Sequence, residues 1–192
     1  MGAGITTTTN SRNFVFGHTY AYNCCQNVSA ITGAIEIFGS DHTVKNYVIG
    51  QANVSDTEVS DEIAVPGSTQ IQYRVGVLIN SSTMTNGGVI RGEISGLAGI
   101  YIQNSFSSEF GSLLSDQNAG HGVFFASNCN DFKADVIGLD NNRLNGDYDT
   151  VITGPSVGRY NIRSISTDEL GSIGNPMRYH FNGQNSSSLY GS

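Results

Sequence analysis

Short runs of alternating apolar and polar residues recur along the chain at a constant spacing. The runs GVLIN, GIYIQ and GVFFA each begin 23 residues after the previous one, at Gly76, Gly99 and Gly122. The runs VIRG, SLLS and DVIG follow at the same spacing, at 89–92, 112–115 and 135–138. Alternation is typical of β-strands, because successive side chains of a strand point to opposite faces. The pattern therefore predicts two short strands in every repeat.

Each repeat contains two apolar positions, 13 residues apart, that we expect to face inward. The pairs are Val77 and Ile90, Ile100 and Leu113, and Val123 and Val136. The earlier stretch 33–50 overlays without gaps on the stretch that ends at 138, which places Ile35 on Val123, Val44 on Phe132 and 48–50 on 136–138. Two similar stretches 88 residues apart indicate that one structural unit repeats along the chain.

A repeat of about 23 residues made of short strands predicts an all-β solenoid, a parallel β-helix whose turns stack about 4.8 Å apart. Helical repeats would instead show apolar residues at a period of 3.6. Inward side chains then form ladders that fill one continuous core. We expect the β-helix over 14–170, a leading segment or fragment boundary at 1–13, and a cap or tail at 171–192. The rhythm breaks at 51–75 and 139–150, where we expect protruding loops.

The composition supports a β-rich fold and excludes some classes of partner. Charged residues make up 13% of the 192 residues, and the chain has 24 glycines but only 3 prolines. A surface of Ser, Thr and Asn suits strands and turns better than long amphipathic helices. The net charge of −7 argues against a nucleic-acid partner, which needs a basic surface. No apolar run is long enough to span a bilayer, so we expect no membrane insertion.

The three cysteines, Cys24, Cys25 and Cys129, form neither a disulfide framework nor a metal-binding pattern. Adjacent cysteines rarely pair with each other and the number is odd, so we expect three free thiols. No Cys/His spacing indicates zinc, and we expect no cofactor. The first residues lack a basic segment followed by an apolar one, so we expect no signal peptide. These features favour synthesis in a reducing cytoplasm.

A row of apolar residues follows the first inward position of each repeat. The row contains Leu78, Tyr101 and Phe124, and we expect it on the outer surface of the stacked strands. Three explanations stay open: the row packs against neighbouring chains, lies beneath a loop of the same chain, or offers a stacking surface for sugar rings. A second outward row is also more apolar than a solvated face should be, and it contains Ile49, Arg91, Leu114 and Ile137. Two such rows favour oligomerisation.

Two acidic residues occupy equivalent positions in successive repeats. Glu93 lies two residues after Arg91, and Asp116 lies one repeat after Glu93. A pair of carboxylates on adjacent strands can catalyse glycoside hydrolysis, and it can also bind a structural cation such as calcium. The simplest alternative is two solvated acids, one of them paired with Arg91. Glu93 and Asp116 are the candidate catalytic residues, and Leu78, Tyr101, Phe124 and Arg91 are the candidates for a glycan-binding or subunit-contact surface.

The stretch from GVLIN to GLDNN, residues 76–142, resembles the right-handed parallel β-helix of bacteriophage tailspike and tail-fibre proteins, within the pectate-lyase-like group. The resemblance rests on the repeat and the composition over about 14–165. It implies a side-by-side homotrimer on the virion tail, made in the host cytoplasm, that attaches to a host surface polysaccharide and often cleaves it. The Gly-Asp-Gly or Asp-Asp-Thr stretch that opens many members is missing, which indicates a fragment and leaves no family catalytic motif for Glu93 or Asp116.

Three functions are therefore expected in turn. The first is a spike segment that attaches to a cell-surface glycan. The second is a polysaccharide hydrolase or lyase that uses Glu93 and Asp116. The third is a trimeric stalk without a ligand. A monomeric secreted lyase is a fourth alternative, and the free thiols and the missing signal peptide count against it.

Overall fold

The computed structural model describes residues 2–25, 28–52, 73–83, 85–126, 128–140, 150–153, 158–167 and 179–182. The described residues form strands joined by turns, and every strand pairing among them is parallel. The strands are β1 (Ile5–Thr6), β2 (Val15–Ala21), β3 (Thr32–Ser40), β4 (Thr43–Gln51), β5 (Arg74–Thr83), β6 (Asn86–Glu93), β7 (Ala98–Gln103), β8 (Phe106–Asp116), β9 (His121–Phe125), β10 (Asn130–Asp140), β11 (Thr150–Thr153), β12 (Gly158–Thr167) and β13 (Tyr179–Asn182). This confirms the prediction of an all-β, solenoid-like fold.

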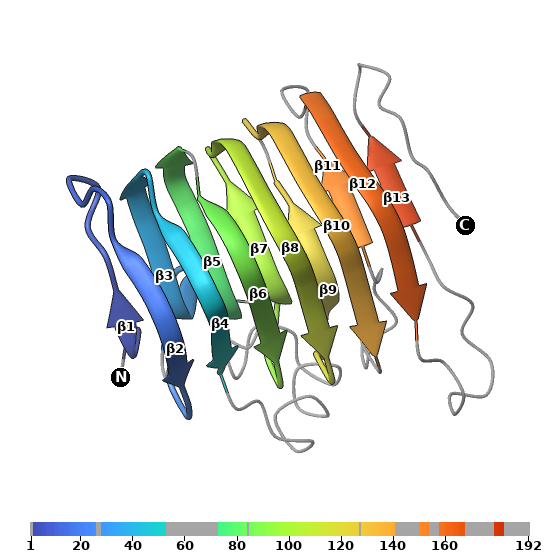
Figure 1. Ribbon diagram of the computed structural model, residues 1–192. Helices are drawn as coiled ribbons and strands as arrows, with labels where there is room; N and C mark the ends of the chain where they lie inside the picture. Colours follow the sequence, from blue (N-terminus) through green and yellow to red (C-terminus); the bar gives the residue numbers. More distant parts are fainter. Residues whose placement is uncertain are drawn as a thin grey trace.

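Successive strands belong alternately to two parallel sheets (Figure 1). The front sheet has the order β2-β4-β6-β8-β10-β12, and the back sheet has the order β1-β3-β5-β7-β9-β11-β13. Among the described residues, the pairing of Thr83 with Phe106 joins the two sheets. Each strand thus pairs with the strand two places further on, which is what a coiled chain with two main strands per turn requires.

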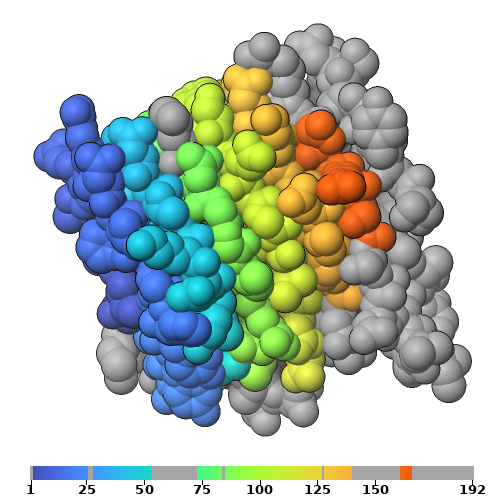
Figure 2. Space-filling model, in the orientation of Figure 1, coloured from blue at the N-terminus to red at the C-terminus, as the bar shows by residue number. Residues whose placement is uncertain are grey.

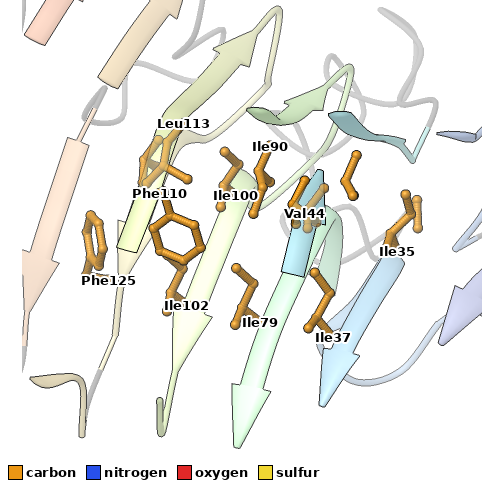
Figure 3. Packing of buried hydrophobic residues seen from close by; sticks show 14 of the residues in the cluster. Ile35, Ile37, Val44, Ile79, Ile90, Ile100, Ile102, Phe110, Leu113 and Phe125 are labelled. Atoms are coloured by element: carbon orange, nitrogen blue, oxygen red, sulfur yellow. The ribbon is translucent and has the colours of Figure 1, made fainter. Parts of the chain in front are cut away.

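The inward ladders lie where the repeat predicts them. In the back sheet, Ile35 pairs with Val77, Val77 with Ile100, and Ile100 with Val123. In the front sheet, Val48 pairs with Ile90, and Ile90 with Leu113. All seven side chains are fully buried, and Figure 3 shows Ile35, Ile90, Ile100 and Leu113 in the same apolar layer. Burial of each such side chain contributes on the order of 1.5–3 kcal/mol, so these ladders are the main source of stability.

The predicted ladder is wrong by one residue in β10. Leu113 pairs with Ile137, which is fully buried, whereas Val136 pairs with Ser112 and is only half-buried. The same slip places Ala134, rather than Phe132, in the row of Val44. One additional residue lies between β9 and β10, and a one-residue shift exchanges the two faces of a strand. The second outward row therefore continues from Leu114 to Gly138 instead of Ile137.

The row predicted on the outside of the back sheet is buried. Leu78 is 2% exposed and Tyr101 is 7% exposed, and both belong to a second apolar cluster with Val75, Ala98 and Ala126. Phe124 is half-buried against this cluster, with its ring centroid 5.0 Å from that of Tyr101. The expectation of a solvent-facing stripe is therefore wrong at Leu78 and Tyr101, because the chain buries both faces of β5 and β7.

The structure describes only parts of the predicted loops and of the predicted terminal segments. Most of the predicted loops at 51–75 and 139–150 lies outside the described residues, although their ends belong to β4, β5, β10 and β11. Strand pairing reaches into both predicted terminal segments, since β1 pairs with β3 and β13 pairs with β11. The three cysteines are buried and form no disulfide, as the sequence predicts.

Glycines bring the two sheets together at the end of the front strands. A Cβ atom on Gly92 would meet the backbone oxygen of Gly99, and one on Gly50 would meet that of Gly76. Gly50 and Gly92 are register partners in the front sheet, and each directly precedes a polar residue of that sheet's outer face. The close approach fixes the position of these two polar residues, Gln51 and Glu93.

Candidate functional site

The predicted carboxylates meet at the C-terminal end of the front sheet. Gln51 of β4 pairs with Glu93 of β6, which pairs with Asp116 of β8, which pairs with Asp140 of β10. The prediction that Glu93 and Asp116 are neighbours is confirmed. Strands in a sheet lie about 4.8 Å apart, so the register places the side chains of Gln51, Glu93 and Asp116, from three successive turns, within reach of one another.

Arg91 holds the two carboxylates in an ion triad of Arg91, Glu93 and Asp116. Its Nη2 atom donates to Asp116 Oδ2 at 2.8 Å and lies 3.3 Å from Glu93 Oε2. The side chains of Glu93 and Asp116 are 14% and 15% exposed, whereas that of Arg91 is 38% exposed. Two carboxylates share one guanidinium, so the triad carries a net charge of about −1 when all three groups are ionised.

Two oxygen atoms next to the triad are buried and lack a hydrogen-bond partner. They are Oδ1 of Asp116 and Oε1 of Gln51, and the Gln51 side chain is nearly inaccessible, since that residue is 8% exposed. A buried acceptor without a donor costs about 1–3 kcal/mol. Gln51, Glu93 and Asp116 therefore form an acceptor row that has more oxygen atoms than donors. Such a row suits a ligand that supplies hydroxyl or amide hydrogens.

The geometry of the triad favours binding over hydrolysis. Because Arg91 Nη2 is 3.3 Å from Glu93 Oε2 and 2.8 Å from Asp116 Oδ2, these oxygens are at most about 6 Å apart, close to the separation in retaining glycosidases. However, a glycosidase needs one carboxyl group that carries a proton toward the leaving oxygen. Here Asp116 accepts a hydrogen bond from the Arg91 guanidinium and Glu93 lies within ion-pair distance of it, so both carboxyl groups are engaged by the same cation.

The other predicted site residues lie on the opposite sheet. Leu78, Tyr101 and Phe124 are register partners on β5, β7 and β9 of the back sheet, whereas Arg91 lies on β6 of the front sheet, between β5 and β7 in the chain. His121 also contacts Phe124, at 4.9 Å between ring centroids. The structure thus brings Arg91 together with Glu93 and Asp116, and it separates Arg91 from the aromatic row with which it was grouped.

A shallow hollow marks the outer face of the front sheet further along the coil. It measures about 410 Å³ and is lined by Glu109, Phe110, Lys133, Ala134, Asp135, Asn161 and Arg163. Lys133 Nζ lies 3.4 Å from Glu109 Oε2, and both side chains are well exposed. Figure 2 shows this face of the molecule, on which the successive strands of the front sheet lie side by side from the N-terminal end in blue to β12 in orange.

Sequence reasoning missed Gln51, Tyr20 and Tyr22. Tyr20 pairs with Ile49, and Ile49 pairs with Arg91, so Tyr20 lies two strands from Arg91 on the front sheet, and Tyr22 follows the end of β2. The signal was the alternation YAY at 20–22, which places both rings on one face. It was overlooked because β2 and β4 do not follow the 23-residue spacing.

The described residues contain neither a metal-binding cluster nor a membrane-spanning helix. Across the described residues, no group of three or more His, Cys, Asp or Glu side chains could hold a metal ion. Within the same part of the chain, no helix is both long and apolar enough to cross a membrane.

Comparisons with protein-family models, curated proteins and solved structures gave no match, so the function is argued from the site.

Proposed function

We propose that the chain is a segment of a tailspike- or tail-fibre-type protein that binds a host surface polysaccharide on the outer face of its front sheet. The observation that supports this proposal is the acceptor row, in which Gln51 and Asp116 each keep a buried oxygen without a partner. A purely structural stalk has no use for two such atoms, because each lowers stability. A polysaccharide supplies hydroxyl donors in large numbers.

The arrangement of the strands suits a long polymer. Equivalent side chains of successive turns lie in rows along the stack, so a linear glycan can contact the same kind of position repeatedly. The polar surface and low charge of the chain fit such a ligand, and the net charge of −7 disfavours nucleic acid. The finer assignment, a right-handed β-helix with turns of about 23 residues, belongs to the same proposal.

The proposal extends to assembly and location. Proteins of the tailspike type form homotrimers with their helices side by side, and we place this chain in such a trimer on the virion. With Leu78 and Tyr101 buried within the chain, Phe124 of the back sheet and Ile49 and Leu114 of the front sheet are the half-buried apolar members of the predicted outer rows. The mass of the protein in solution tests this part: a trimer supports it and a stable monomer contradicts it.

Depolymerisation by Glu93 and Asp116 is the second candidate. The separation of their carboxylate oxygens favours it, and the shared guanidinium opposes it. Elimination, the chemistry of a lyase, would need a base, and in the triad Arg91 already forms ion pairs with both carboxylates. Binding without cleavage is therefore the primary proposal.

One assay separates these functions. The protein is incubated with a panel of bacterial surface polysaccharides, and binding, new reducing ends and absorbance at 235 nm are measured. Binding without products supports the proposal. Reducing ends that disappear in Asp116→Asn would establish a hydrolase, whereas new absorbance would establish a lyase. A protein that neither binds nor cleaves any member would be assigned to the stalk.

A further inference from the structure

Two exposed tyrosines lie beside the ion triad at the edge of the front sheet. Tyr20 lies in β2, and Tyr22 directly follows the end of that strand. Tyr20 is 51% exposed and Tyr22 is 59% exposed. Their rings are stacked, with centroids 6.2 Å apart and an angle of 16° between the planes. Exposed apolar residues that lie together on a surface often mark a binding or interaction site, and the two stacked rings form such a contiguous surface.

The tyrosine pair and the triad belong to one surface. The register runs from Tyr20 to Ile49 and then to Arg91, so only one strand, β4, lies between the tyrosines and β6. Burial, followed by the nearby Glu93 carboxylate and Tyr22, raises the pKa of Tyr20 above its usual 10.0, and Arg91 opposes this. The phenol of Tyr20 therefore interacts electrostatically with Glu93 and Arg91 of the triad.

Gln51 connects the two features. It ends β4, the strand between β2 and β6, and it is the register partner of Glu93. Gln51 and Glu93 lie at paired positions of adjacent strands, and paired side chains point to the same face of a sheet. Gln51 is more than nine-tenths buried, and its Oε1 atom has no hydrogen-bond partner. An unpaired acceptor thus lies between the aromatic pair and the carboxylates.

The charge of this surface limits the ligand. The triad has two carboxylates for one guanidinium, and the unpaired atoms at Gln51 and Asp116 are both acceptors. A polymer with its own carboxylates or sulfates would meet like charge and find few donors. A neutral sugar supplies hydroxyl donors and an apolar ring face, which suits an aromatic ring. A protein partner would offer carbonyl acceptors as often as donors, so it fits the acceptor row less well.

We propose that Tyr20 and Tyr22 form the stacking surface for a neutral sugar residue whose hydroxyl groups donate to Gln51, Glu93 and Asp116. This inference rests on the proposed polysaccharide-binding function and narrows its ligand class to neutral polysaccharides. Arg91 orients the two carboxylates, and the Gln51 and Asp116 side chains turn outward to accept from the sugar, since the unpaired oxygen atom of each is buried in the chain. The aromatic surface contributes affinity, and the acceptor row contributes selectivity against anionic polymers.

The test uses the full chain and two sets of probes. Binding to neutral dextran, mannan and galactomannan is compared with binding to anionic alginate and polygalacturonate by affinity electrophoresis. We expect at least one neutral polymer to bind and the anionic polymers not to bind. The double variant Tyr20→Ala/Tyr22→Ala should weaken this binding at least tenfold. Phe106→Ala is the matched control, because Phe106 is also exposed, at 39%, but begins β8 away from the triad.

A second variant keeps the test independent of folding defects. Gln51→Leu removes the unpaired acceptor and keeps a similar volume, so the melting temperature should stay the same or rise. Affinity for the neutral polymer should nevertheless fall. A purely structural Gln51 would change stability without changing the affinity.

The outcomes separate this inference from the proposed function. Binding to anionic polymers alone, or neutral binding that all variants retain, would overturn the inference and leave the polysaccharide-binding function standing. Absence of binding to these polymers and to every member of the panel of bacterial surface polysaccharides would overturn both. A drop in the oligomer mass of Tyr20→Ala/Tyr22→Ala, without any glycan affinity in the unaltered protein, would assign the tyrosine pair to a subunit contact instead.

Discussion

The outer faces of the two sheets differ although their strands share one sequence pattern. On the front sheet, exposed and buried residues alternate, and the outer face carries the ion triad and the tyrosine pair. On the back sheet, β5 and β7 are buried on both faces, and Leu78 and Tyr101 belong to a second apolar cluster. The outward apolar residues Leu78 and Tyr101 of the back sheet are therefore covered by other parts of the same chain.

The largest expected loss of folding free energy distinguishes the outer face of the back sheet from that of the front sheet. Leu78→Asp places a charge in the second apolar cluster, and we expect a loss of more than about 4 kcal/mol of folding free energy, since both the packing and the desolvation of the carboxylate are unfavourable. Leu114→Asp, at a half-buried position of the front sheet, should cost less than about 1.5 kcal/mol. Urea denaturation measures both. Equal losses would show that the two faces are not different.

The register of β10 gives the next effect. Ile137→Ala should cost about 2–4 kcal/mol, because Ile137 is fully buried in the ladder of Leu113. Val136→Ala should cost about 1 kcal/mol or less, because Val136 is half-buried on the other face. The same denaturation experiment ranks the two variants. A larger loss at Val136 would restore the ladder expected from a strict 23-residue spacing.

The close approach of the sheets can be tested with one methyl group. Gly92→Ala should cost about 1–3 kcal/mol, because the new Cβ would collide with the backbone of Gly99 in the back sheet. Gly17→Ala is the control, since a Cβ there would have open space. Thermal unfolding of the two variants should differ by several degrees. A Gly92→Ala protein as stable as the control would mean that the sheets can separate at this end without loss.

The smallest effect concerns the buried thiols. Burial raises the pKa of Cys25 to about 12 and that of Cys129 to about 11, from an ordinary value of 9.0. A raised pKa in the folded state means that stability is full below pH 9 and falls as the pH rises toward 11–12, because only the unfolded chain then loses these protons. Unfolding followed between pH 8 and 11 checks the sign, and Cys129→Ala should flatten the decline. Rapid alkylation of the native thiols by iodoacetamide at pH 8 would contradict their burial.

Much of the fold was predictable where the repeat is regular. Val77, Ile100 and Val123 are spaced 23 residues apart, and they form one ladder because residues at this spacing are register partners on neighbouring strands. The slip in β10 was not predictable, because Val136 and Ile137 are both apolar and one inserted residue decides which of them faces inward. The burial of Leu78 could not be predicted from the pattern either. Periodicity shows on which face of a strand a side chain lies, but it does not show which residues cover that face.

The candidate site was predictable in part for the same reason. Glu93 and Asp116 lie one regular repeat apart, so their contact through Arg91 could be expected. Gln51 and the tyrosine pair belong to turns of different length, and no spacing connects them to Glu93 in the sequence. Unpaired buried acceptors cannot be recognised in a sequence at all, because they depend on which donors happen to be within reach.

The most direct test of the account follows the tyrosine rings while a glycan is added. The protein is labelled with ¹³C-tyrosine, the signals of Tyr20, Tyr22 and Tyr101 are assigned by substitution, and the neutral polymer that binds best is titrated. We predict that the signals of Tyr20 and Tyr22 shift with the bound fraction, whereas that of Tyr101, buried on the back sheet, stays in place. Shifts confined to Tyr101, or binding that leaves Tyr20 and Tyr22 unchanged, would contradict a glycan site on the front sheet.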